Sequence, residues 1–282
     1  MKSRGFTLIE LIMVILITGI LAATVTVFLR PAIDGYLDTR RRVTLSDMAD
    51  TALRRIAQDI RSAVPNSVRT FTIVGPAPDC LQLVPTSGGG RYRMAPDLNL
   101  GASAWIDTTT ATTTFDVLNS RRVVPGIGLT PVIGDWIVIN NQNGGDVYIG
   151  ANTAQIGNLQ EPPPGGVAVG QYRITIPATQ FSQGYEGGRF MVVPNAGGNQ
   201  TVVYRCAGNT LFRGRAPFNA APADACAAAN QLVATNVRAC QFIYNPNLGA
   251  TQQSGFVEMT LTLGDANESV TLVHGVHVEN TP

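Results

Sequence analysis

Glu10 is the residue whose type and position most clearly require a chemical explanation. It lies in an almost wholly apolar run from Phe6 to Leu29, where an ionised carboxylate costs about 2.5–3.5 kcal/mol on membrane-insertion scales. A cut between Gly5 and Phe6 would create an α-amine four residues before Glu10, one turn away on the same helix face. The two charges could then neutralise each other, or each could pair with the opposite charge of a neighbouring subunit.

Four cysteines, Cys80, Cys206, Cys226 and Cys240, are the next candidates for chemistry. They form no Cys-x-x-Cys motif, and an even number in an oxidising compartment favours disulfides over reactive thiols or zinc. Four cysteines allow three pairings. The loop-like, Ala-rich stretch between Cys206 and Cys226 favours a 206–226 bridge, worth about 3 kcal/mol in the chain-entropy model, together with an 80–240 bridge.

Metal, cofactor and catalytic sites are not indicated. His274 and His277 have His-x-x-His spacing, but an odd offset on a strand puts them on opposite faces, where they cannot chelate one ion. The segment Asn140–Asp146 could bind calcium, although an ordinary loop explains its composition equally well. Gly126-Ile127-Gly128 is typical of a turn, because no helix pattern follows it. Since no Gly-x-Ser-x-Gly, P-loop or paired His–carboxylate motif occurs, we expect neither catalytic residues nor a cofactor.

The composition is that of a neutral globular chain with many turns. The 282 residues are 45% hydrophobic and 14% charged, with a net charge of +1. Such a chain is not disordered, and its charge gives no electrostatic reason to expect nucleic acid as a partner. With 29 glycines and 17 prolines, it favours short strands joined by turns.

The apolar run that holds Glu10 predicts a transmembrane helix over residues 6–29. At about 1.5 Å per residue it spans roughly 36 Å, enough for a hydrocarbon core of about 30 Å. Lys2 and Arg4 would keep the N-terminus in the cytoplasm. A secretory signal peptide cut near Ala22-Ala23 is the alternative, but the buried charge and the helical pattern beyond residue 30 argue against it.

An amphipathic stem over residues 30–64 continues the helix. Its apolar residues recur at helical spacing until Pro65 and Asn66 end the pattern. Arginines at 40–42 and 54–55 alternate with aspartates along it. These charges are either solvated surface or pairs between subunits, and the pattern leaves both interpretations open.

Residues 65–282 have the period of two that is typical of strands. The predicted strands are 71–74, 80–84, 135–139, 146–149, 172–176, 189–193 and 201–206, with a C-terminal hairpin formed by 256–263 and 269–278. Val257, Met259, Leu261 and Leu263 should share one face of that hairpin. The polar, Thr-rich stretch 85–170 predicts either long loops or a β-subdomain. The fold class is therefore α+β, a long helix packed on antiparallel sheet with a β-rich head.

The string Gly5-Phe6-Thr7-Leu8-Ile9-Glu10, followed by an apolar helix, resembles the class III leader of type IV pilins and type II secretion pseudopilins. The resemblance implies a pilin-like fold and a cleaved leader of residues 1–5. It also implies that a prepilin peptidase cuts between Gly5 and Phe6 and methylates the amine of Phe6, and that Glu10 guides subunit registration. Many pilins have a proline near position 27, whereas this chain has Pro31, where a bend is expected.

Short segments of the head add a second resemblance, to minor pilins of MSHA-type (mannose-sensitive haemagglutinin) pili. They are 80–86, 90–93, 204–206 and 274–282. This implies a low-abundance subunit that initiates or caps a pilus. Its partners would be other pilins, the prepilin peptidase, inner-membrane lipid and the assembly platform, with the head periplasmic and the pilus tip as a possible location. The alternatives are a J-type minor pseudopilin of type II secretion and a membrane-anchored periplasmic enzyme, for which no catalytic constellation is present.

Overall fold

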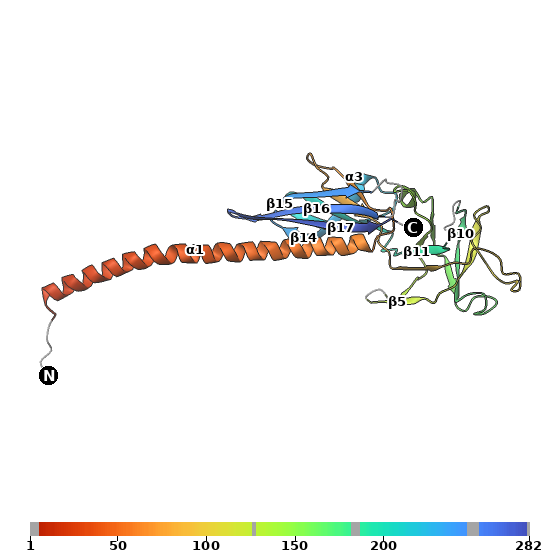
Figure 1. The fold of residues 1–282 in the computed structure, drawn as a ribbon, viewed down its shortest axis with the longest axis horizontal. Coiled ribbons are helices and arrows are strands. Elements are labelled where there is room, and N and C mark those ends of the chain that lie inside the picture. Colours follow the sequence, from red (N-terminus) through yellow and green to blue (C-terminus); the bar gives the residue numbers. More distant parts are fainter. Residues whose placement is uncertain (1–5, 126–127, 182–186, 247–253, 281–282) are drawn as a thin grey trace, which may run out of the picture.

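The computed structural model describes residues 6–125, 128–181, 187–246 and 254–280. A single helix, α1 (Leu8–Arg61), extends far beyond a β-rich head (Figure 1). The helix ends at Arg61, with Ser62 as its C-cap, shortly before Pro65 and close to the predicted end. It continues through Pro31 and curves gently towards its free end (Figure 1). The α+β, pilin-like fold class is thus confirmed.

Only the second half of α1 packs against the head. Its buried residues recur every three or four positions on one face: Leu45, Ala49, Ala52, Leu53, Ile56, Ala57 and Ile60. No residue from Phe6 to Thr44 is buried. The helix is long and apolar enough to cross a membrane, and its most apolar window is 0% buried in the fold. Since burial of apolar surface is the main stabilising term in folding, this free half requires an apolar environment from outside the chain.

Two antiparallel sheets and α1 share the main core. The first sheet has the order β1 (Arg69–Phe71), β2 (Cys80–Leu83), β12 (Thr201–Ala207), β13 (Thr210–Ala216) and β14 (Ala229–Thr235). The second is the meander β15 (Val237–Asn245), β16 (Ser254–Asp265) and β17 (Glu268–Glu279). The predicted C-terminal hairpin is confirmed, with Val257, Met259, Leu261 and Leu263 all buried on its inner face.

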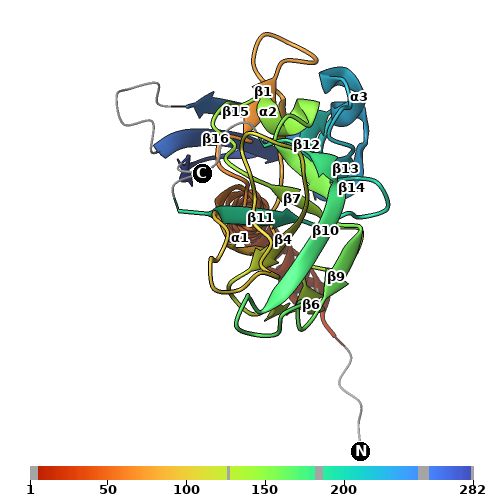
Figure 2. The same cartoon turned by 90° about the vertical axis from the view of Figure 1, so that its right-hand side faces the viewer.

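A β-subdomain is inserted between β2 and β12, which are neighbours in the first sheet. It lies beyond the end of α1, at the far side of the molecule from the N-terminus (Figures 1 and 2). Its strands are β3 (Gly88–Arg91), β4 (Thr112–Val117), β5 (Arg122–Val124), β6 (Gly128–Thr130), β7 (Trp136–Val138), β8 (Thr153–Gln155), β9 (Asn158–Gln160), β10 (Tyr172–Thr179) and β11 (Arg189–Val193).

The subdomain has three small sheets, in the orders β4-β10-β9, β3-β11-β7-β8 and β5-β6. They enclose a second core of aromatic and branched side chains, among them Tyr92, Phe115, Tyr172 and Phe190. Of the two possibilities that the sequence left for residues 85–170, the β-subdomain is therefore the one that forms.

Two local predictions were wrong. Residues 146–149 form a short helix, α2 (Asp146–Ile149), because Gly150 adopts a left-handed conformation that ends a helical turn. Val147 and Tyr148, which are adjacent, are both buried within this short helix. The first predicted strand, 71–74, ends as β1 at Phe71, because the Asp79 carboxylate accepts the backbone N–H groups of residues 73 and 74 and bends the chain.

All four cysteines form disulfides, as predicted, but the favoured pairing was wrong. The bonds are Cys80–Cys226 and Cys206–Cys240, with Cα–Cα distances of 6.2 and 6.4 Å. Cys206 shares the helix-facing side of β12 with Tyr204 and is packed against the main core, as is its partner on β15. Cys80 lies on the opposite face, where the short helix α3 (Pro222–Ala227) brings in Cys226. The five-stranded sheet thus separates Cys206 from Cys226.

Candidate functional site at the free end of the N-terminal helix

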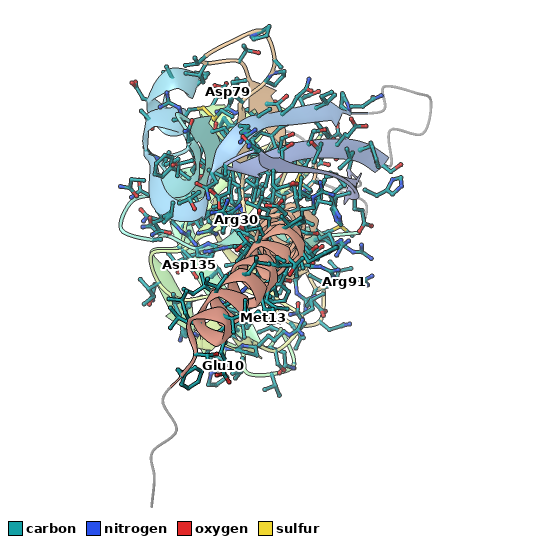
Figure 3. The ribbon with its side chains drawn as sticks, turned by 90° about the vertical axis from the view of Figure 1, so that its left-hand side faces the viewer. Glu10, Met13, Arg30, Asp79, Arg91 and Asp135 are labelled. Carbon is teal, nitrogen blue, oxygen red and sulfur yellow. A yellow bond between two sulfur atoms is a disulfide. The ribbon has the colours of Figure 1, made fainter. Side chains whose placement is uncertain are left out.

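Glu10 lies in the first turn of α1, at the end farthest from the head (Figure 3). Thr7 is the N-cap, and its carbonyl oxygen accepts the backbone N–H groups of Glu10 and Leu11 at 3.1 and 3.2 Å. Phe6 precedes the cap and is 76% exposed. Gly5, the other residue of the predicted cleavage site, lies outside the described residues. Phe6 and Glu10 are therefore accessible both to an enzyme and to a neighbouring helix.

Three threonine hydroxyls of the apolar half, all beyond the first turn, are hydrogen-bonded within the helix. The hydroxyl of Thr18 donates to the carbonyl oxygen of Val14, that of Thr24 to Ile20, and that of Thr26 to Ala22, at 2.5, 2.9 and 2.8 Å. Such bonds let threonine lie in an apolar environment without an unpaired donor. Among the described residues, the Glu10 carboxylate has no hydrogen-bond or ionic partner.

Comparison with known proteins decides the nature of this segment. The family model described as the prokaryotic N-terminal methylation motif matches residues 1–26. The chain carries the leader of a type IV pilin or pseudopilin. Neither the curated proteins nor the solved structures contain a match to the chain. The pilin leader implies processing by a prepilin peptidase and assembly with other pilins in general, and with the apolar helix it is consistent with a membrane-anchored protein.

The stem that follows the leader's helix uses several of its charges within the chain. Arg41 pairs with Asp38 at 3.1 Å, and Arg54 pairs with Asp50 at 2.6 Å. Arg42 reaches across to Glu268, at the turn between β16 and β17, and this ion pair lowers the pKa of the glutamate. Asp34 and Asp47 are exposed, have no partner within the described part of the chain and stay available to solvent or to other subunits.

A polar cluster joins the last turn of α1 to the first sheet. The Tyr204 hydroxyl donates to Oδ2 of Asp59 at 2.7 Å, and Arg213 donates to the same oxygen through Nε at 3.0 Å. The Arg213 ion pair closes at 2.9 Å through its terminal nitrogen. Burial, and then the negative charge of Asp59, raises the pKa of the Tyr204 hydroxyl. We call Asp59, Tyr204 and Arg213 the stem anchor.

Sequence reasoning did not find the stem anchor or the Arg42–Glu268 pair. Asp59 and Arg213 are 154 positions apart, and nothing in their local patterns links them. The prediction for the histidines is confirmed, since His274 faces inward with Val276 and Val278, whereas the ring of His277 packs on Phe256 at 5.2 Å on the other face.

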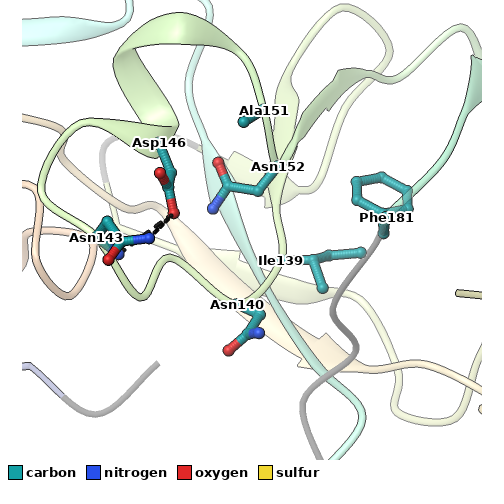
Figure 4. Close-up of a pocket in the computed structure, with 7 residues that line it drawn as sticks. All are labelled: Ile139, Asn140, Asn143, Asp146, Ala151, Asn152 and Phe181. Carbon is teal, nitrogen blue, oxygen red and sulfur yellow. Dashed lines mark hydrogen bonds between the residues drawn. The ribbon is translucent and has the colours of Figure 1, made fainter.

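The Asn140–Asp146 segment, named as a possible calcium loop, borders a pocket of about 230 Å³ (Figure 4). Asp146 is the only carboxylate among the described lining residues, and its Oδ2 accepts hydrogen bonds from the backbone and side chain of Asn143. Among the residues that the structure covers, no group of three or more His, Cys, Asp or Glu side chains could hold a metal. A Ca²⁺ site takes six to eight oxygen ligands, several of them usually carboxylates, so this pocket carries no metal assignment.

Proposed function

We propose that the protein is a low-abundance structural subunit, a minor pilin, of an MSHA-type type IV pilus. Its N-terminal helix would help to initiate, cap or assemble the filament. One observation carries the proposal. The half of α1 that bears the methylation motif is apolar and does not pack against the head, and the single carboxylate of its apolar run, Glu10, has no partner in the described chain. The short head segments that resemble the minor pilin MshO support the subtype.

In this proposal the leader directs both processing and topology. A prepilin peptidase removes residues 1–5 and methylates the amine of Phe6. The protein crosses the inner membrane once, with a cytoplasmic N-terminus and a periplasmic head, and contacts other pilins and the assembly platform. Two disulfides in the head suit an oxidising compartment. The protein acts as a structural subunit without enzymatic activity or a cofactor.

A J-type minor pseudopilin of type II secretion is the second candidate. It is favoured by the large β-rich head, which such pseudopilins share, and by a leader that both systems use. The genes beside this one discriminate between the two, because a pilus subunit is expected among pilus genes and a pseudopilin among secretion genes.

The proposed role of Glu10 is tested by Glu10→Val. Removing the charge should ease insertion of a single subunit by up to about 3 kcal/mol. Assembly should nevertheless weaken, because the amine of Phe6 in a neighbouring subunit would lose its counter-charge in a low dielectric, at a cost of several kcal/mol. Methylation keeps that amine positive, so the expectation holds for the modified chain.

The measurement is recovery in sheared filaments at equal membrane level, with intact mass confirming that the mature chain starts at methylated Phe6. Asp34→Val is the matched control, because it removes an exposed, unpaired carboxylate from the same helix outside the apolar run. Glu10→Val should lower recovery and Asp34→Val should not. Normal incorporation of Glu10→Val, or a mature chain that keeps residues 1–5, would contradict the proposal.

A further inference from the structure

A trough on the inserted β-subdomain gathers three arginines. It has a volume of about 520 Å³ and lies between the edge strand β3, strand β11 and the β5–β6 ribbon. The lining residues are Thr86, Gly88, Gly89, Gly90, Arg91, Asn119, Arg122, Arg189, Phe190 and Met191. Among these described lining residues the ionisable ones are all arginines, so we call this surface the arginine trough.

The three arginines differ from the other arginines of the subdomain. Arg93, Arg121 and Arg173 are each paired, with Asp97, Glu161 and Asp116 respectively. Arg91, Arg122 and Arg189 are exposed, and none has an ion pair or a side-chain hydrogen bond within the described residues. The unpaired arginines of the subdomain therefore all face the same trough.

Two of these arginines are held directly opposite each other. Arg91 and Arg189 are register partners on the antiparallel strands β3 and β11. Like charges in that position are destabilising, so folding of the subdomain alone gives no reason for the arrangement. The backbone N–H of Arg91 donates to Oδ1 of Asn119 at 2.7 Å, which fixes this arginine at the rim. In the view along α1, Arg91 lies to one side of the helix (Figure 3).

Gly90 of β3 lies directly opposite Phe190 of β11, and no side chain fits at its position. A Cβ at Gly90 would lie 2.6 Å from Oδ1 of Asn119 and 2.7 Å from a ring carbon of Phe190. The Phe190 ring is only 2% exposed and forms part of the second core beneath the wall. The trough thus combines a backbone wall, an apolar floor with Met191, and guanidinium groups at its rim, and it is open to solvent.

We propose that the arginine trough binds an acidic polypeptide segment of a partner protein. Guanidinium groups match carboxylates in a two-pronged geometry, and such a ligand would neutralise the opposed pair Arg91 and Arg189. Nucleic acid fits less well, because none of the described lining residues is an exposed aromatic side chain on which a base could stack. Residues 65–282 also contain eleven Arg, no Lys and thirteen Asp+Glu, a net charge of −2 with His neutral, so the positive charge is local to the trough and does not extend into the wide basic surface that a long polyanion needs.

The test uses the full mature chain in detergent and a fluorescein-labelled hexaglutamate peptide as the probe. Binding is measured by fluorescence anisotropy at about 0.05 M salt and again at about 0.5 M, where screening is stronger. The variant Arg91→Gln/Arg189→Gln removes the opposed pair. Arg55→Gln is the matched control, because Arg55 is an exposed arginine on the stem, far from the trough along the chain. Arg91→Lys/Arg189→Lys keeps the charge but removes the guanidinium geometry.

We expect saturable binding at low salt that weakens about tenfold or more in the double Gln variant, by less in the double Lys variant, and by less than about twofold in Arg55→Gln. The proposal is overturned if the probe does not bind up to millimolar concentration, or if Arg55→Gln weakens binding as much as the double Gln variant. Tighter binding of an oligothymidylate of equal charge would also overturn it, by identifying the trough as a nucleic-acid site. The proposal does not depend on the assembly role of Glu10.

Discussion

The stem anchor should contribute more to the stability of the head than any exposed charge on the helix. The perturbation is Asp59→Ala, which removes the acceptor that Tyr204 and Arg213 share. The side chains of Asp59 and Arg213 are 22% and 15% exposed, so water only partly replaces the lost contacts. Breaking a fully buried pair costs about 3–5 kcal/mol, and with this partial exposure we expect about 3 kcal/mol.

Two further variants show how much of this loss of stability comes from the Tyr204 hydrogen bond and how much from the charge of Asp59. Tyr204→Phe removes one hydrogen bond and should cost about 1 kcal/mol. Asp59→Asn keeps an oxygen that can accept from Tyr204 but removes the charge, so its loss of stability should lie between those of Tyr204→Phe and Asp59→Ala. A double-mutant cycle with Arg213→Ala isolates the direct coupling between Asp59 and Arg213. Since both groups share Tyr204 as a neighbour, we expect the effects of the two single variants not to add.

The assay is urea unfolding of the full chain in a mild detergent, followed by the fluorescence of Trp105 and Trp136, both of which lie in the head. Asp47→Ala is the control, because Asp47 is an exposed carboxylate on the same helix with no partner in the described chain, and its loss should change stability by less than about 0.5 kcal/mol. Equal effects of Asp59→Ala and Asp47→Ala would refute the reasoning, since the anchor would then be no better than a solvated charge.

Two predictions concern the disulfides of the head and the ion pair between Arg42 of the stem and Glu268 of the head. Peptide mapping under non-reducing conditions should recover Cys80–Cys226 and Cys206–Cys240; a 206–226 peptide would contradict the structure. Their sequence separations of 146 and 34 residues correspond to about 5 and 4 kcal/mol in the chain-entropy model, so replacing either pair by serine should lower the urea midpoint clearly. Because Arg42 lowers the pKa of Glu268, their contact stabilises the fold above the ordinary glutamate pKa and is lost as the pH falls below about 4. The protection of amide hydrogens at the β16–β17 turn, relative to their intrinsic exchange rates at each pH, should therefore fall in acid in the natural chain, and an Arg42→Gln variant with the same acid response would contradict this.

Local periodicity explains what the sequence could predict. The helix has one continuous pattern up to Pro65, and the C-terminal hairpin alternates without interruption from Val257 to Leu263. From Leu45 to Ile60 of the helix and on the inner face of the hairpin, apolar residues occupy the buried positions, so short-range rules were sufficient there. The leader could also be predicted from the sequence alone, because its motif is a contiguous string, and the family model matches the same residues.

Long-range geometry explains what the sequence could not predict. The Ala-rich stretch between Cys206 and Cys226 was interpreted as a loop that a disulfide could close, but it contains α3, which covers the outer face of the sheet. The correct partner of Cys206 depends on which face of β12 it occupies, and that face is set by the packing of β12 against α1. The arginine trough could not be predicted for the same reason, since its arginines come from three strands that lie side by side only in the folded subdomain.

The junction between the helix and the inserted subdomain connects the two ends of the molecule mechanically. The side chain of Asn66, just after α1, donates to the carbonyl oxygens of Asn141 in the subdomain and Asn280 beside β17, both at 2.9 Å. Asn141 donates in return to the carbonyl oxygen of Pro65 at 2.7 Å, and Val64 packs with the subdomain residue Val138 in a shared apolar cluster. These contacts tie the end of the helix to the inserted subdomain without an intervening flexible linker. A force applied to a ligand bound in the trough would therefore be transmitted to α1 through this junction. The exposed apolar half of the same helix would remain available for assembly.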